Sequence, residues 1–188
     1  MAAGPRAHSF SSHLSTDMTR NTNARVAGFA FLVYIAAGLS GLAVPRDGSW
    51  AAVFPLLTSF SALVLGVTLY AITREQNADL AMLAMVCRVV EGVPRVSGEI
   101  YFAVGSLLFS WLLLRGRMIP APLAWLGVIA SALLVVLIPS QLAGFLGGAA
   151  GWRSPITWTL WSPMLVFEVT LAMWLIIKGV AHPARQIP

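Results

Sequence analysis

Two charged residues, Arg88 and Glu91, lie three positions apart inside an otherwise apolar stretch of the sequence. Residues at positions i and i+3 of a helix share one face, so both side chains are expected to point the same way. A charged side chain within a membrane helix costs several kcal/mol unless it faces the interior of a bundle and finds a partner there. The spacing therefore predicts that this pair faces the centre of a helical bundle.

A third charged residue, Glu168, is predicted to join this pair. Arg88 lies ten residues after Ala78, the expected inner end of its helix, and Glu168 lies ten residues before Lys178, the expected inner end of the last helix. At the rise of an α-helix, each lies about 15 Å from its inner end, and Glu91 lies one turn farther out. The arithmetic predicts Arg88 flanked by Glu168 and Glu91 near the membrane midplane.

Two interpretations of this cluster remain open on the sequence. In one, the ions form a static pair that fixes how the helices pack. In the other, the cluster lines a site or pathway, as charged residues inside membranes often do. Two carboxylates beside one arginine would also leave one acid available to carry a proton.

The composition defines the class of protein that holds this cluster. Hydrophobic residues make up 58% of the 188 residues, charged residues only 10%, and the mean hydropathy is +0.81. Soluble chains carry about a quarter charged residues. The sequence therefore predicts an integral membrane protein whose first partner is the lipid bilayer. The net charge is +5, but the basic residues are scattered between apolar runs, so nucleic-acid binding is not expected.

Six apolar segments must position the cluster, so the predicted fold is an all-α bundle of six transmembrane helices. They cover about residues 25–44, 50–72, 78–93, 99–115, 122–142 and 156–180. Together they define a membrane domain over residues 24–180, with Thr22 or Asn23 as a candidate N-cap of the first span. The polar residues 1–23 are predicted to form a disordered cytoplasmic tail, and residues 181–188 a short cytoplasmic one.

The third and fourth spans are predicted to form a hairpin. As one helix, Ala78–Arg115 would be about 57 Å long, nearly twice the roughly 30 Å hydrocarbon core, and Gly92, Pro94 and Gly98 interrupt it. Basic residues support six spans with both termini cytoplasmic, since eight of them would then lie inside and three outside. The inner residues are Arg6, Arg20, Arg25, Arg74, Arg115, Arg117, Lys178 and Arg185, and the outer ones are Arg46, Arg95 and Arg153.

Residue types that are missing from the spans exclude several kinds of chemistry. Cys87 is the only cysteine, which excludes an intrachain disulfide and a cysteine metal cluster. His8, His13 and His182 all lie outside the spans, and Lys178 is the only lysine. No histidine is therefore expected to bind haem or a metal within the membrane, and no lysine to bind retinal. No cofactor is predicted.

Several short segments follow one another in a characteristic order: ARVAG at 24–28, RVVE at 88–91, GSLLF at 105–109, RGRMIP at 115–120, FE at 167–168, LAMWL at 171–175 and KG at 178–179. Their order and spacing resemble the bacterial membrane family catalogued as domain of unknown function 4386, over about residues 24–180. The resemblance implies a multi-pass protein of the bacterial cytoplasmic (inner) membrane. Resemblance to this family implies an architecture but no established activity.

Three functions are compatible with the sequence. In the first, Arg88, Glu91 and Glu168 line a small polar cavity that binds or translocates an anionic or amphipathic ligand, or they relay protons. In the second, the protein is a structural or accessory subunit that packs against a larger membrane complex or forms a homo-oligomer. The third, a membrane enzyme, has the least support, because no nucleophile and base are seen together.

Overall fold

The chain folds into six α-helices, and no strand occurs in the part that the structure describes. This computed structural model describes residues 6–45, 48, 50–93, 98–145, 152 and 154–181, with only the backbone for residues 6–18. The helices are α1 (Arg6–Ala43), α2 (Val53–Thr73), α3 (Ala78–Glu91), α4 (Gly98–Arg115), α5 (Ala121–Leu142) and α6 (Pro155–Ile177). The all-α bundle and the hairpin of α3 and α4 are thus confirmed.

Five of the six helices are long and apolar enough to cross a membrane: α2, α4, α5, α6 and the part of α1 from Thr19 to Ala43. The exception is α3, whose 14 residues extend about 21 Å. Local sequence sets both of its ends. The Asn77 side chain accepts a hydrogen bond from the backbone N–H of Leu80 at 2.9 Å, and Gly92 follows the last residue, Glu91. As a result α3 is shorter than the predicted span over residues 78–93.

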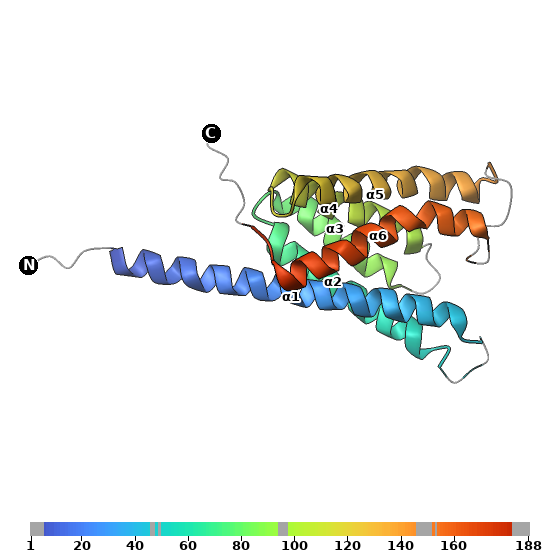
Figure 1. Cartoon of the computed structure of the whole chain (residues 1–188), viewed down its shortest axis with the longest axis horizontal. Coiled ribbons are helices and arrows are strands. Elements are labelled where there is room, and N and C mark those ends of the chain that lie inside the picture. The colour runs from blue at the N-terminus through green and yellow to red at the C-terminus, as the bar shows by residue number, and fades with distance from the viewer. Residues whose placement is uncertain are drawn as a thin grey trace, which may run out of the picture.

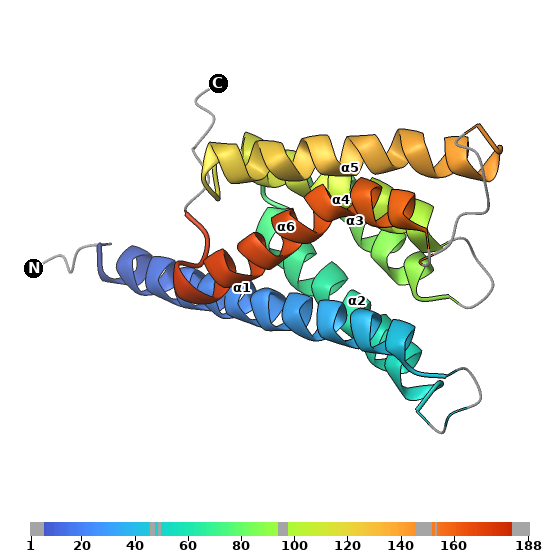
Figure 2. The ribbon, with the colours of Figure 1, turned by 45° about the vertical axis from the view of Figure 1, so that its right-hand side comes forward.

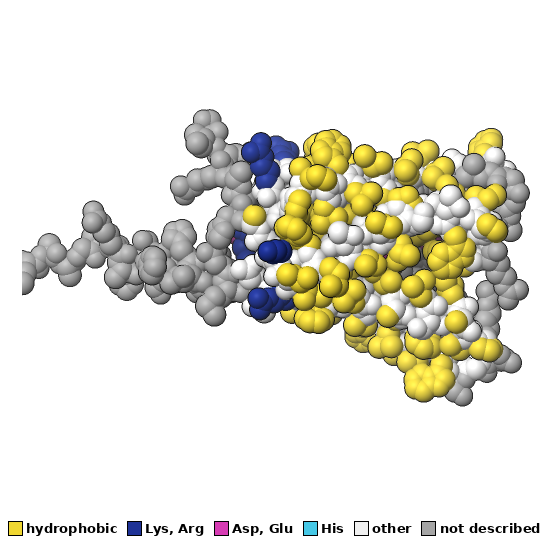
Figure 3. Space-filling view, viewed as in Figure 1, with side chains coloured by type: hydrophobic (Ala, Val, Ile, Leu, Met, Phe, Trp, Pro, Cys, Tyr) yellow, Lys and Arg dark blue, Asp and Glu magenta, His cyan; other side chains and the backbone are white. Residues whose placement is uncertain are grey.

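The helices pack in chain order around a closed ring, because each contacts the next and α6 returns to α1 (Figure 1). Basic side chains gather at one end of this ring, and hydrophobic side chains cover the surface beyond it (Figure 3). We call this the basic end. Its exposed residues are Arg25, Arg74, Arg115, Arg117 and Lys178. Arg46, Arg95 and Arg153, predicted at the opposite end, lie outside the described residues.

The contact between α1 and α6 is close near the basic end. A Cβ atom added to Gly28 of α1 would lie only 2.7 Å from the backbone oxygen of Ala172 in α6, so a larger residue would push the helices apart. Beyond this crossing the two helices diverge, and α6 runs toward α5 (Figures 1 and 2). Small residues that allow close backbone contact are common between membrane helices. Gly28 therefore allows the close approach of α1 and α6 at this crossing.

Two more glycines hold α3 tightly between its neighbours. A Cβ atom added to Gly66 of α2 would lie 3.2 Å from the Cβ of Arg88, and one added to Gly105 of α4 would lie 3.1 Å from the Cβ of Cys87. The backbones of α2 and α4 therefore approach α3 at the level of Arg88. This close packing on both sides leaves the arginine with an exposed fraction of only 1%.

The N-terminal segment differs from the sequence prediction. In place of a disordered tail over residues 1–23, residues 6–23 continue α1, so neither Thr22 nor Asn23 caps it. No glycine or proline interrupts residues 6–27, and extending an existing helix avoids the cost of a new nucleus. At the basic end Arg20 of this extension forms an ion pair with Glu75, at 3.4 Å. The other helix bounds lie within three residues of the predicted ones.

Candidate functional site

Arg88 is the centre of a buried group of polar side chains from four helices. Its Nη1 donates a hydrogen bond to Oε2 of Glu91 at 3.1 Å, one turn along the same helix. Its Nη2 donates to the hydroxyl of Ser106 in α4 at 2.9 Å. The same Nη2 lies 3.6 Å from Oε1 of Glu168 in α6, which is an ion-pair distance and longer than a hydrogen bond. The predicted proximity of Arg88, Glu91 and Glu168 is confirmed.

The carboxylates of Glu91 and Glu168 differ in the hydrogen bonds that they accept. Glu91 receives a hydrogen bond from Arg88 and another, on Oε1, from the hydroxyl of Tyr34 in α1. Glu168 is 96% buried as a residue, and its Oε1 has no hydrogen-bond partner in the structure. A buried carboxylate oxygen without a donor is costly. Glu168 is therefore the member of the cluster whose bonding capacity is least satisfied.

Aromatic rings enclose the guanidinium group. Its central carbon lies 4.7 Å from the ring centre of Phe102, 5.8 Å from that of Tyr34 and 5.9 Å from that of Phe31. All three distances are within the range at which a cation is attracted to the face of a ring. The rings of α1 and α4 therefore help to stabilise a charge that would otherwise be costly to bury.

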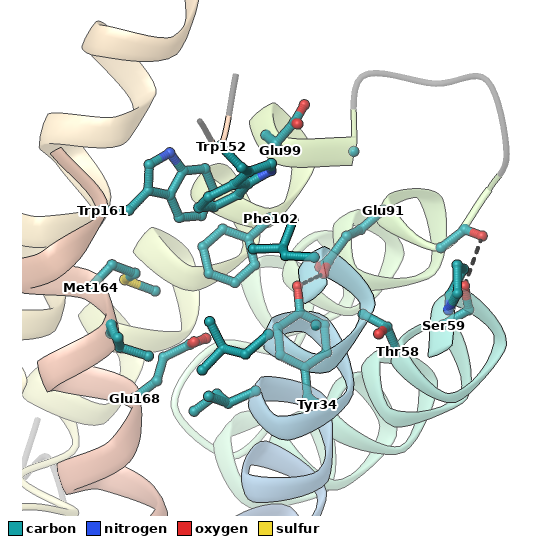
Figure 4. Close-up of a pocket in the computed structure, with 18 of the residues that line it drawn as sticks. Tyr34, Thr58, Ser59, Glu91, Glu99, Phe102, Trp152, Trp161, Met164 and Glu168 are labelled. Carbon is teal, nitrogen blue, oxygen red and sulfur yellow. Dashed lines mark hydrogen bonds between the residues drawn. The ribbon is translucent and has the colours of Figure 1, made fainter. Parts of the chain in front are cut away.

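A cavity of about 570 Å³ lies beside this cluster, toward the end of the bundle opposite the basic one. Glu91, Glu168, Tyr34 and Phe102 form its inner part (Figure 4). Arg88 itself is not among the lining residues. The cavity thus reaches the carboxylates and the rings that contact Arg88, while the guanidinium lies behind them.

A continuous row of aromatic side chains leads from the cluster toward the end of the bundle opposite the basic one. The ring of Tyr34 stacks with Phe102 at 6.2 Å between centres, Phe102 contacts Trp161 at 5.4 Å, and Trp161 contacts Trp152 at 5.0 Å. Trp158 continues the row, since its Nε1 donates to the backbone oxygen of Trp152 at 2.8 Å. All five residues line the cavity. One wall is therefore aromatic along its length.

The cavity also borders the region where α1 and α6 diverge. Leu39 and Leu42 of α1 line it and are 42% and 45% exposed. On α6, Pro163 lacks the N–H that would bond the carbonyl of Thr159, and the hydroxyl of Ser162 donates to that carbonyl at 2.9 Å instead. Glu99, at the start of α4, is an exposed lining residue. The opening thus combines apolar side chains with one carboxylate.

Tyr34 and Ser106 also belong to this cluster, but they are uncharged, so the spacing of the charges did not predict them, although their depth in the helices does. Tyr34 lies nine residues after Arg25, and Ser106 lies nine residues before Arg115. At the rise of a helix, both lie about 14 Å from basic residues at the basic end, near the depth of Arg88. Applying the calculation to every polar residue, and not only to the charged ones, would have selected both.

The fold and the site together define a multi-pass α-helical membrane protein with buried arginine–glutamate pairs. Among the described residues, no group of three or more His, Cys, Asp or Glu side chains could hold a metal ion. The chemistry that the site offers is charge recognition, hydrogen bonding and proton exchange at the two carboxylates.

Residues 95–179 match the family described as Domain of unknown function (DUF4386), the same family that the sequence motifs resemble. This range includes α4, α5, α6 and Glu168. It begins after Arg88 and Glu91, so the resemblance over residues 24–94 stays a prediction. No curated protein and no solved structure matches the chain.

Proposed function

We propose that the protein binds, and thereby sequesters or translocates, a small amphipathic molecule in the cavity beside the Arg88 cluster. The observation that supports this most is that the cavity extends along its aromatic wall from the exposed residues Leu39, Leu42 and Glu99 to Glu91 and Glu168. A static ion pair needs no access, and a space of about 570 Å³ is within the usual range for ligand sites. The role of Arg88, Glu91 and Glu168 in binding or proton transfer follows from this proposal.

An anionic ligand, which the sequence also suggested, fits this cavity less well. It would need to reach the guanidinium of Arg88, but that group is bonded to Glu91 and Ser106 and does not line the cavity. A carboxylate or phosphate entering the cavity would meet Glu91 and Glu168 first. Like charges at short range in a water-poor site repel strongly.

Filling the cavity tests the proposal without altering the charged cluster. Gly38 of α1 lines the cavity, and a Cβ atom added there meets no atom within 4 Å. Gly38→Phe should therefore fold while occupying space that a ligand needs. Ala36→Phe is a matched control, because Ala36 is an exposed residue of α1 that does not line the cavity. Binding would be measured with the uncharged fluorescent probe N-phenyl-1-naphthylamine and purified protein in phosphatidylcholine nanodiscs.

We expect saturable probe fluorescence with the parent protein and with Ala36→Phe, and little above empty nanodiscs with Gly38→Phe. Equal binding by both variants, or no saturable binding by the parent, would contradict the proposal. Either result would favour the alternative function, an accessory subunit that packs against a larger membrane complex or a second copy.

We also propose that the six helices cross the bacterial cytoplasmic membrane with both termini in the cytoplasm, so that the cluster lies near the midplane. The exposed basic residues at one end of the bundle support this orientation. Reporter fusions after Arg46 and Arg153 should report outside, and fusions after Arg74, Arg117 and Arg185 inside. Because α3 is short, the fusion after Arg117 is decisive, and an outside signal there would exclude six crossings.

A further inference from the structure

The charges and rings of the cavity indicate which class of molecule it takes. We infer that the cavity binds an amphiphile with a cationic head group, of the alkylammonium type, with the head beside Glu168 and the alkyl chain toward α1 and α6. This inference rests on the proposed function, because it names the ligand class of the same site.

The first observation behind this inference is the charge of the residues that line the cavity. Glu91, Glu99 and Glu168 line the cavity, and none of the described lining residues is a lysine or arginine. The two inner carboxylates outnumber the single arginine that they contact. With both ionised, the cluster has one negative charge in excess. A cation that enters the cavity would neutralise that charge, and an anion would add to it.

The second observation is that one carboxylate oxygen of Glu168 accepts no hydrogen bond. Its side chain extends from α6 toward the middle of the cavity (Figure 4). The side chain is 95% buried, and its Oε1 receives no hydrogen bond, since Arg88 lies 3.6 Å away. A primary ammonium group carries three N–H donors and a positive charge, so in the cavity it would share this carboxylate with Arg88, which reaches it only at an ion-pair distance.

The aromatic wall supports the same head group. Trp161, Phe102 and Tyr34 line the cavity next to the carboxylates. Their faces attract cations, as the position of Arg88 near Phe102 and Tyr34 already shows. Aromatic faces together with carboxylates are typical of sites that recognise organic ammonium ions. An anion would gain nothing from these faces.

The opening accounts for the apolar part of the ligand. Leu39 and Leu42 of α1 and Trp158 of α6 line the cavity and are 42%, 45% and 41% exposed. They lie where α1 and α6 diverge on the hydrophobic surface of the bundle. An alkyl chain placed here would contact these side chains and extend toward the surrounding lipid. The site therefore suits a molecule that enters from the bilayer.

Competition among three six-carbon amphiphiles tests the inference. Hexylammonium, hexanol and hexyl sulfate share the alkyl chain and differ in charge. Each would displace N-phenyl-1-naphthylamine from the protein in phosphatidylcholine nanodiscs at pH 7, with empty nanodiscs as the blank. We expect hexylammonium to displace the probe at about one tenth of the concentration of hexanol or less, and hexyl sulfate to be the weakest.

Two variants and one control test which carboxylates cause the preference for hexylammonium. Glu168→Gln retains the shape of the side chain and leaves Arg88 paired with Glu91, so it should fold and lose most of the preference for hexylammonium. Should Glu168→Gln fail to fold, Glu99→Gln at the exposed opening should still lower the preference. Glu75→Gln removes a carboxylate at the basic end, outside the cavity, and should leave the preference unchanged.

The possible results distinguish failure of this inference from failure of the proposed function. If the probe binds and is lost in Gly38→Phe, but the three amphiphiles compete equally, the inference is wrong and the proposed function stands. A stronger effect of hexyl sulfate, or a preference that survives both Glu168→Gln and Glu99→Gln, would also overturn the inference. If the parent binds no probe, the proposed function fails, and the inference fails with it.

Discussion

Two arginine–glutamate contacts of this protein show how much the surroundings of an ion pair matter. Arg88 contacts Glu91 at 3.1 Å and Glu168 at 3.6 Å in the middle of the bundle, and the three side chains are 1%, 8% and 5% exposed. Arg20 contacts Glu75 at 3.4 Å at the basic end, where the Glu75 side chain is 46% exposed and that of Arg20 10%. The distances are similar and both arginines are buried, but Glu75 is exposed whereas Glu91 and Glu168 are not.

This difference determines what each pair contributes to stability. Water reaches the Glu75 carboxylate, so the attraction within its pair with Arg20 is partly offset by hydration and side-chain entropy. The buried ions have lost most of their water, and each depends on the others and on nearby rings and hydroxyls. A change in one member of the central cluster therefore strands the others, whereas Glu75 at the basic end can return to solvent.

The largest expected effect follows from removing Arg88 alone. Arg88→Met should lower the free energy of unfolding by about 3–5 kcal/mol, because Glu91 and Glu168 lose their buried cation. Unfolding by dodecyl sulfate in mixed maltoside micelles, followed by circular dichroism, would measure it. A loss below about 1 kcal/mol would mean that water reaches the cluster and that the contrast between the pairs is false.

A smaller effect is expected for Tyr34→Phe. The variant retains the ring that contacts Phe102 and removes only the hydroxyl that donates to Glu91. Loss of a hydrogen bond to a charged group typically costs about 1.5–3 kcal/mol. The same unfolding experiment would measure it, with Tyr70→Phe as the control, since Tyr70 lies outside the cavity lining. Equal effects of the two substitutions would show that the hydroxyl bond to Glu91 is unimportant.

Replacing the whole cluster should affect stability less than removing Arg88 alone. Arg88→Met combined with Glu91→Gln and Glu168→Gln leaves no uncompensated charge, so we expect a free energy of unfolding within about 1 kcal/mol of the parent. The same variant should lose the preference for hexylammonium. A triple variant that folds and retains this preference would show that the cluster serves only in helix packing.

The smallest effect is expected at the basic end, where the carboxylate of Glu75 is exposed. Glu75→Gln should change the free energy of unfolding by about 0–1 kcal/mol, and less in high salt. Unfolding titrations at low and high sodium chloride would measure both values. A loss as large as that of Arg88→Met would show that the basic end is less hydrated than the exposure of Glu75 indicates.

The sequence alone determined the helical architecture and the pairing of the charges. Composition and segment length predict apolar helices, because a membrane requires all backbone hydrogen bonds to form within such segments. Gly92, Pro94 and Gly98 predict the break between α3 and α4. The cost of an isolated charge in lipid predicts that Arg88 has a partner, and counting along helices of known rise placed that partner at Glu168.

Only the tertiary structure decided what surrounds the cluster. Helix rotation and crossing depend on contacts between distant segments, such as Gly28 with Ala172, and no local pattern specifies them. The sequence gives the depth of Tyr34 and Ser106, but these contacts turned both residues toward Arg88 and placed the guanidinium behind the cavity wall. They also made α1 and α6 diverge beside a row of aromatic rings. Which charge faces the cavity is a property of packing in three dimensions, so spacing along the chain could not reveal it.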